Sequence, residues 1–406
     1  MNIIRYWLKP ALIALVVLAS FTSCRKDEGG NYKYFISKEL AVTHSEAYIS
    51  ALLNFAAPEY PELNDLTSYL SGDVNVYKIV YRTKVFNDDI NASGLVCTPS
   101  SGGKYPVICF QNGTNTLNSS APSEYPLNLM YQFVEFVASM GYIVVIPDYP
   151  GFGESADIPH PYLIAEPTVR STTDMLYAVK EMLLGEIQGV EAEKDLYLIG
   201  YSQGGWATLA LHKDIEQNRS NDFDLKGSVC GAGPYSLTLL FSGMTTTSTY
   251  PMPVYIGYIV DAYSVYNQFT NPVSDIFKEP YASRLGSLYT GTLGSDQINS
   301  QLTTSIPDLF TADFLSGFLT DNKYSSVREG LAANSISAWK TSVPVLFIHG
   351  GGDTSVNPIT TENIYSDMIQ AGTSAEICKK EILPGLDHGD AVVPAIVKGL
   401  LFIRNL

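Results

Sequence analysis

One serine in this chain stands in a setting that could make it a nucleophile. Residues 200–204 read Gly-Tyr-Ser-Gln-Gly and follow the apolar run 196–199. This order is typical of a buried strand, a tight turn and a helix, and the pattern Gly-x-Ser-x-Gly leaves the serine hydroxyl exposed on the turn. Backbone N–H groups at the start of the helix would face an oxyanion there. The pattern predicts that Ser202 attacks a carbonyl group.

A serine hydroxyl is a weak nucleophile and needs a neighbouring base, usually a histidine that a carboxylate holds in place. In chains with this turn, an acid and then the histidine follow the serine. Two of the five histidines follow a suitable acid, His349 and His388. His388 lies in the loop between a predicted strand, 376–382, and a predicted helix, 392–402, and is the expected base. His349 ends the predicted strand 345–348 and is expected to be structural.

Asp353 is the expected acid, because it lies in the loop that leaves the strand 345–348. The carboxyl ends of parallel strands meet at one edge of a sheet, so Ser202, Asp353 and His388 should converge there. Three other aspartates are less suitable: Asp148, Asp387 and Asp390. The first precedes the serine and is expected to shape its own loop. The other two lie too near His388 in the chain to reach its ring well.

An oxyanion site needs two backbone donors. The first should be the N–H of Gln203, the residue after the serine, and the second should come from the loop after the first central strand. That loop contains Asn112, Gly113 and Thr114, and the sequence leaves open which of them donates. A plain turn would also explain the Asn-Gly pair.

The elements that must hold these residues follow from hydropathy. From residue 105 onward, almost wholly apolar runs alternate with helical patterns, which predicts a parallel sheet covered on both faces. The predicted strands are 107–110, 142–146, 196–199, one around Val229, and 345–348, and the helices between them are 127–140, 169–184 and 206–215. Earlier, the alternating stretches 74–85 and 90–98 predict an antiparallel hairpin, and residues 31–70 predict a tether with one or two helices.

Residues 234–340 interrupt the alternation of strands and helices. An insertion at this place in the order predicts a helical cap over the strand ends, with surface elaboration as the alternative. We expect an apolar pocket from five of its side chains: Tyr250, Tyr255, Ile256, Tyr258 and Ile259. The predicted division of the chain is 1–23, a signal peptide; 24–72, the tether and N-terminal helices; 73–233 with 341–406, the core; and 234–340, the cap.

The first residues are typical of a targeting signal. Arg5 and Lys9 precede the apolar run 11–19, which is too short to span a bilayer. Residues 21–24 read Phe-Thr-Ser-Cys and resemble a bacterial lipobox, so Cys24 is the predicted lipidation site, with an ordinary secreted cysteine as the alternative. We expect an exported protein, anchored by lipid at the outer membrane or surface of a Gram-negative bacterium.

Composition limits the partners. The chain has 406 residues, 46% of them apolar, and a formal net charge of −16, which argues against binding to nucleic acid. No Cys/His spacing suggests a metal, and we expect neither a metal nor a cofactor. The cysteines after residue 24 are expected to be buried and free, although their even number permits disulfides: Cys97, Cys109, Cys230 and Cys378.

Taken together, these motifs resemble those of the α/β-hydrolases, and among them the secretory lipases and lipase-A-type esterases. The resemblance runs from about residue 74 to the C-terminus and includes the stretch 147–155, Pro-Asp-Tyr-Pro-Gly-Phe-Gly-Glu-Ser. It implies an α/β-hydrolase fold, a triad of Ser202, His388 and Asp353, and cleavage of small-molecule or lipid esters through an acyl-enzyme. Asn112 departs from the His-Gly pair of many relatives.

Two alternatives remain open. A serine peptidase of the prolyl-oligopeptidase kind uses the same residues in the same order. Such enzymes usually carry a large N-terminal propeller, whereas only the predicted tether and helices of residues 31–70 stand between the targeting segment and the first predicted strand here. A surface lipoprotein that binds ligands through its tyrosine-rich cap, without catalysis, would also fit the 27 tyrosines of the chain.

Overall fold

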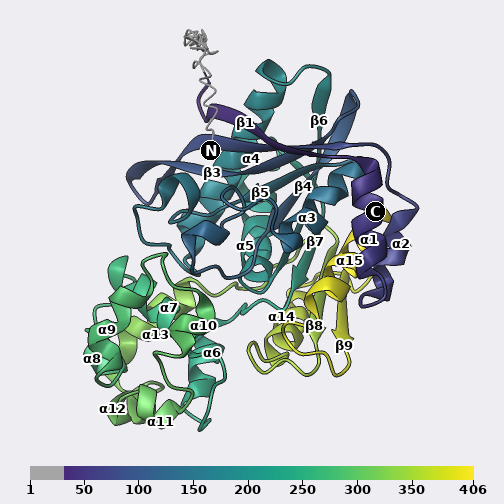
Figure 1. Ribbon diagram of the computed structural model, residues 1–406. Coiled ribbons are helices and arrows are strands. Elements are labelled where there is room, and N and C mark those ends of the chain that lie inside the picture. Colours follow the sequence, from purple (N-terminus) through teal and green to yellow (C-terminus); the bar gives the residue numbers. More distant parts are fainter. Residues whose placement is uncertain (1–31) are drawn as a thin grey trace, which may run out of the picture. The chain divides into compact units, whose positions relative to one another are not determined.

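The computed structural model describes residues 32–406, so the predicted signal peptide and Cys24 lie outside the described part. One sheet of nine strands forms its centre, in the order β1-β2-β3-β5-β4-β6-β7-β8-β9 (Figure 1). The strands are β1 (Phe35–His44), β2 (Val74–Val85), β3 (Asp88–Pro99), β4 (Gly103–Gln111), β5 (Ile143–Pro147), β6 (Val190–Tyr201), β7 (Asp224–Gly231), β8 (Val345–Gly350) and β9 (Cys378–Leu383).

The sheet changes from antiparallel to parallel at β5. Strands β1, β2 and β3 pair antiparallel, and β3 pairs antiparallel with β5. All pairs from β5 through β4, β6, β7 and β8 to β9 are parallel. Their apolar runs are buried because helices cover both faces of this part of the sheet. The mostly parallel sheet with its N-terminal hairpin confirms the fold predicted from sequence.

Strand β1 corrects the prediction of only a tether and helices before residue 70. It pairs with the edge of β2, and only its end residues, Phe35 and His44, are buried. An edge strand with so few buried residues carries little hydropathy signal, which explains the miss. The Glu181 carboxylate also holds its start, since it accepts hydrogen bonds from the backbone N–H groups of residues 33–35.

Helices from distant parts of the chain cover the two faces. One face packs against α1 (Glu46–Ala56), η1 (Pro61–Leu63), α2 (Asn64–Thr67), α3 (Leu129–Glu135), η3 (Phe136–Met140) and α15 (Val392–Arg404). The other packs against α4 (Ala165–Gly185), α5 (Gln203–Asn218) and α14 (Ile359–Gln370). Two further short turns are η2 (Asn118–Ser120) and η4 (Gly153–Ser155). No helix within residues 32–406 is long and apolar enough to cross a membrane.

A helical insertion separates β7 from β8, and Figure 1 shows it in green as one group beside the sheet. It comprises α6 (Leu237–Met244), α7 (Pro253–Val265), α8 (Val273–Ile276), α9 (Tyr281–Leu288), α10 (Ser295–Asn299), α11 (Ile306–Leu309), α12 (Ala312–Gly317), η5 (Asn322–Tyr324) and α13 (Ser325–Ala333). The insertion has its own apolar core, and that core extends to Trp206 of α5. Trp206 Nε1 donates a hydrogen bond of 3.0 Å to the Asn334 carbonyl and so ties the insertion to the sheet.

Helix α15 lies close to the sheet at Gly399. A Cβ there would lie 2.7 Å from Val229 Cγ1 and 3.0 Å from Ile199 Cδ1. We expect Gly399→Leu to lower the free energy of unfolding by about 1–3 kcal/mol, because it overpacks this contact. In α6, a Cβ on the exposed Gly243 would meet nothing within 4 Å, so Gly243→Leu should be neutral or slightly stabilising. Urea unfolding compares the two, and an equal loss from both would contradict the close packing of α15.

Candidate active site

Ser202 lies on the sharp turn between β6 and α5 in an unusual backbone conformation. Its φ is 60° and its ψ is −122°. Its N–H donates to the Gly231 carbonyl at 2.9 Å, and its carbonyl accepts the N–H of Trp206 at 3.2 Å. The turn therefore belongs to both the sheet and the helix, and the serine is held at the carboxyl end of a central strand.

Three glycines make this turn possible because backbone approaches each of them too closely for a side chain. A Cβ on Gly200 would overlap the Gly204 carbonyl, one on Gly204 would overlap the Gln111 carbonyl, and one on Gly205 would overlap the Gly231 carbonyl. The glycines of the predicted motif are thus explained by contacts with β4, β7 and the turn itself.

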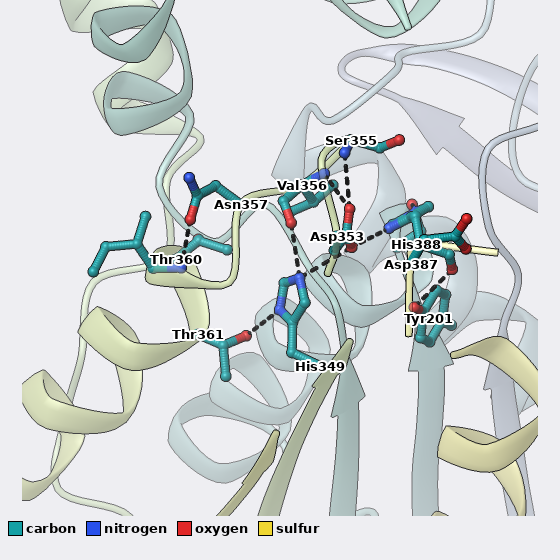
Figure 2. Close-up of polar contacts among 12 residues, drawn as sticks. Tyr201, His349, Asp353, Ser355, Val356, Asn357, Thr360, Thr361, Asp387 and His388 are labelled. Carbon is teal, nitrogen blue, oxygen red and sulfur yellow. Dashed lines mark hydrogen bonds and ion pairs between the residues drawn. The ribbon is translucent and has the colours of Figure 1, made fainter. Parts of the chain in front are cut away.

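The structure brings Ser202, His388 and Asp353 together at one edge of the sheet. His388 Nε2 lies 2.9 Å from Ser202 Oγ, and His388 Nδ1 lies 2.5 Å from Asp353 Oδ2. A carboxylate only accepts, so Nδ1 carries a hydrogen and Nε2 is free to accept the serine proton. The imidazole comes from the loop between β9 and α15, and the carboxylate comes from the loop after β8 (Figure 2).

Several donors surround the Asp353 carboxylate, which is buried. Oδ1 accepts the N–H groups of Ser355 and Val356, both at 2.8 Å, and Oδ2 accepts from His388 and His349. Burial raises the pKa of Asp353, but the hydrogen bonds from His349 and His388, the attraction of His388 and the Val356 N–H outweigh it and hold this pKa well below its usual range. The carboxylate is charged at every pH at which the protein would work.

His349 touches the same carboxylate oxygen from the other side, as Figure 2 shows. Its Nε2 lies 3.1 Å from Asp353 Oδ2 and 2.8 Å from the Val356 carbonyl, so this nitrogen carries a hydrogen. Its Nδ1 lies 2.8 Å from Thr361 Oγ1. The sequence predicted a structural histidine at the end of β8, and the structure adds that it contacts the predicted acid directly.

Tyr201 was not among the predicted site residues. Its hydroxyl donates to the His388 carbonyl at 2.8 Å and fixes the backbone of the loop that carries the imidazole (Figure 2). Its position directly before Ser202 is the only signal in the sequence that could have suggested such a contact.

The three less suitable aspartates have other surroundings. Asp387 Oδ1 accepts the N–H groups of Gly389 and Asp390 and so closes its own turn. Asp148 is buried, and its carboxylate accepts the hydroxyls of Ser93 and Ser123. Within residues 32–406, none of the three is hydrogen-bonded to His388.

The loop after β4 lies beside Ser202. A Cβ on Gly113 would be 3.9 Å from Ser202 Cβ. Among the described residues, no acceptor pairs with the backbone N–H of Gly113, Thr114 or Gln203. The Thr114 side chain bonds the Tyr162 hydroxyl at 2.7 Å, and the Asn112 carbonyl accepts from Tyr149 at 3.3 Å, which hold the loop in place.

A second buried histidine holds the side chain of Gln203. His160 Nδ1 donates to the Pro150 carbonyl at 2.7 Å, and its Nε2 lies 2.9 Å from Gln203 Nε2, which donates to it. Burial lowers the pKa of His160 to about 4, although the hydrogen bond to Pro150 opposes this. The imidazole is therefore neutral near pH 7 and accepts from Gln203. Sequence analysis did not find this contact, which joins residues 43 positions apart.

A hollow of about 350 Å³ surrounds the serine hydroxyl, and its lining includes Ser202, His388 and the loop after β4. Of the five insertion residues expected to form an apolar pocket, only Tyr255 lines it. The other four are buried in the core of the insertion: Tyr250, Ile256, Tyr258 and Ile259. That expectation was wrong for these four, because their aromatic and aliphatic side chains fill a core.

The remaining predictions concern cysteines and metals. Cys97, Cys109, Cys230 and Cys378 are all buried and free. Within residues 32–406, no group of three or more His, Cys, Asp or Glu side chains is arranged to hold a metal ion.

Comparisons with known proteins place this geometry in context. A family model described as secretory lipase matches residues 127–388. A candidate hydrolase from Legionella pneumophila is similar in structure, with 25% identity, a TM-score of 0.81, and coverage of 92% of this chain and 98% of that one. No curated protein matches the sequence significantly.

Two further solved structures share the fold. The rice cell wall degrading esterase LipA from Xanthomonas oryzae is 22% identical, with a TM-score of 0.77 over 91% of this chain and 97% of that one. Lipase A from Candida antarctica in its closed state is 15% identical, with a TM-score of 0.66 over 91% and 81% of the two chains.

The pKa of His160 predicts how stability depends on pH. The folded protein keeps this imidazole neutral down to about pH 4, whereas the unfolded chain takes up the proton near pH 6.5. The unfolded state therefore binds more protons between these values, and stability falls as the pH falls through this window.

His160→Gln removes this titration but keeps an acceptor and a donor. From pH 7 to pH 4, the unfolding free energy of the wild type should therefore fall by about 3 kcal/mol more than that of the variant. Urea unfolding at both pH values measures the shift, and a constant difference would contradict a neutral His160.

Proposed function

Because this chain belongs to the secretory lipase family, and is therefore a carboxylic ester hydrolase, we propose that it cleaves esters through an acyl-enzyme on Ser202. The observation that carries the proposal is the continuous hydrogen-bonded row of Ser202 Oγ, the His388 ring and the Asp353 carboxylate, with distances of 2.9 Å and 2.5 Å. The same residues were predicted from the order of motifs in the sequence, and all three lie within or at the end of the stretch 127–388 that the family model matches.

In the first half of the reaction, His388 Nε2 takes the proton of Ser202 as Oγ attacks the ester carbonyl carbon. The carbonyl π-electrons move to oxygen and give a tetrahedral oxyanion. This intermediate collapses, the bond to the alcohol oxygen breaks, and the alcohol leaves with the proton from His388. Water then attacks the acyl-enzyme, again losing a proton to His388, and the acid departs as Ser202 regains its hydrogen.

Asp353 supports the imidazolium that exists between these proton transfers. Its carboxylate holds the Nδ1–H of His388, which keeps Nε2 directed at the serine. The positive charge on the ring forms 2.5 Å from a carboxylate that stays ionised, so the charged intermediate is stabilised where it arises.

The oxyanion is expected to accept hydrogen bonds from the N–H of Gln203 and from an N–H of the loop after β4. The free N–H groups of Gly113 and Thr114 and the position of Gly113 beside Ser202 support this assignment over a plain turn. Removing one such donor costs about 2.7–4 kcal/mol of transition-state stabilisation in related chemistry.

The division into a core and a cap is part of the same proposal. The helical insertion contributes Tyr255 to the hollow around Ser202, and Tyr250 of the insertion donates to the Ser355 carbonyl beside Asp353. These contacts are consistent with a cap over the carboxyl ends of the strands. The proposed boundaries remain those predicted from sequence, 234–340 for the cap and 73–233 with 341–406 for the core.

Anchoring by lipid on Cys24 is the last part of the proposal. It rests on the apolar run 11–19 and the lipobox-like residues 21–24. Acyl chains on a cysteine bind a bilayer by about 0.8 kcal/mol for each buried methylene. The net charge of −16 would give no attraction to anionic lipids, so hydrocarbon would have to supply the binding.

Replacement of the serine tests the chemistry. Ser202→Ala should lower the turnover of p-nitrophenyl acetate by on the order of 10⁴–10⁶ with folding intact, and it should abolish labelling by a fluorophosphonate probe. Ser366→Ala, an exposed serine on α14, is the matched control and should keep both. Normal ester turnover by the Ser202 variant would end the proposal. Peptide amides in the same assay address the peptidase alternative, since a peptidase would cleave them whereas an esterase would leave them intact.

Replacement of Cys24 tests the anchor. In the full-length chain expressed in a Gram-negative host, Cys24→Ser should abolish metabolic labelling with palmitate and move the protein from the membrane to the soluble fraction. Cys97→Ser changes a buried cysteine and should leave both unchanged. Palmitate labelling that survives in the Cys24 variant would show that another residue carries the lipid, and a wild type without label would show that the protein carries none.

A further inference from the structure

A second hollow lies near the serine pocket and is wholly apolar. All thirteen residues that line it are Leu, Met, Phe, Val or Ile. They come from three parts of the chain: the N-terminal helices α1 and α2 with their connections, the helices α3 and η3, and the C-terminal helix α15. The N-terminal helices thus form one wall of this hollow, and α3, η3 and α15 form the others.

The two hollows meet at Met130 of α3 and Ile396 of α15, since each of these side chains lines both. On the serine side, Phe110 and Val392 continue the apolar surface toward the junction. Met130 and Ile396 are both half-buried, and the unbranched methionine side chain adapts easily to a neighbour. Met130 and Ile396 therefore separate the serine pocket from the space beneath the N-terminal helices, and both hollows present apolar side chains to this boundary.

The apolar lining of the second hollow determines which kind of ligand it can accept. An apolar cavity without polar partners holds no ordered water but accepts a hydrocarbon. Protein interiors contain few voids, and each lowers stability because its lining lacks contacts. The second hollow retains a free volume of about 30 Å³, so side chains at the junction must move aside for a ligand longer than one that fills the serine pocket.

We propose that the hydrocarbon chain of the ester substrate extends from Ser202 past Met130 and Ile396 into the hollow between α2, α3 and α15. This inference rests on the proposed function, because it needs the ester carbonyl at Ser202. It assigns the preferred substrates to esters with an unbranched chain of several methylenes. It also gives the N-terminal helices a role, as the outer wall of the site for that chain.

Chain-length series test the inference. Each methylene moved from water to an apolar lining is worth about fourfold in an equilibrium constant. The wild type should therefore show a higher kcat/KM for p-nitrophenyl octanoate than for the acetate. A second series keeps the acyl group as acetate and compares ethyl acetate with octyl acetate. Hydrolysis is followed by the proton that the released acetic acid gives up. A length preference in either series supports the inference and shows which half of the ester enters the hollow. Equal kcat/KM values for the short and the long ester in each of the two series would overturn the inference.

Variants connect the preference to this hollow. Leu70→Trp fills the second hollow from its N-terminal wall, and Ile396→Trp fills the junction. Each should lower the octanoate-to-acetate ratio of kcat/KM, or the corresponding ratio of the alcohol series, at least tenfold. Leu401→Trp is the matched control, because this half-buried leucine of α15 lines neither hollow, and it should keep the ratio within twofold. Met130→Ala widens the junction and should raise the ratio.

The outcomes separate the two proposals. If the wild type and variants turn over acetate but all ratios stay unchanged, the inference fails and the proposed function stands. If the wild type cleaves no ester and resists the fluorophosphonate probe, the proposed function fails. One tryptophan variant could lose even acetate turnover through misfolding. In that case the long-to-short ratios of kcat/KM measured for Met130→Ala and for the other tryptophan variant test the inference.

Discussion

The left-handed backbone of Ser202 is the constraint on which the rest of the site depends. A non-glycine residue held in such a conformation costs on the order of 1–3 kcal/mol, and it persists only where its surroundings fix it. Here β7 fixes it through the Gly231 carbonyl, and α5 fixes it through the N–H of Trp206. The carbonyls of Gln111 and Gly231 pack so closely on Gly204 and Gly205 that β4, β6, β7 and α5 must all be in place. The reactive hydroxyl is thus a product of the assembled sheet, although its motif is only five residues long.

Asp353 is held by its surroundings in a similar way, and it connects the acid to the base. One carboxylate oxygen accepts from two imidazoles, His388 and His349, and each of those rings keeps its hydrogen on the nitrogen that faces the oxygen. The two rings differ in freedom. His349 is buried and is held by Val356 and Thr361 as well, whereas the serine hydroxyl is the only hydrogen-bond partner of His388 Nε2 within residues 32–406. Because both nitrogens that face the carboxylate keep their hydrogens, the carboxylate stays charged while His388 gains and loses a proton at Nε2.

Sequence reasoning reached the parts of the site that depend on local pattern and chain order. The glycines around Ser202, the loop position of Asp353 and the loop position of His388 each follow a parallel strand, so one topological rule predicts that they meet. The contacts that depend on packing could not be predicted. Nothing near His160 in the chain indicates that it meets Gln203, and β1 has too few buried residues to show a period of two. The tyrosines of the insertion illustrate a different limit, because aromatic density alone does not distinguish a core from a pocket.

The lining of the serine pocket also bears on how the reaction ends. A carboxylic acid with an ordinary pKa near 4.3 is ionised at neutral pH, and a buried carboxylate is stable only with a partner. No Lys or Arg is among the described residues that line this pocket, and the protein as a whole carries a net charge of −16. Contact with the apolar surface stabilises the bound ester, which is neutral. The same contact stabilises the bound carboxylate, but the described lining has no Lys or Arg to offset the cost of desolvating its charge. The described lining therefore offers the ionised acid no ion pair with Lys or Arg, and only the N–H groups proposed for the oxyanion are left to stabilise its charge.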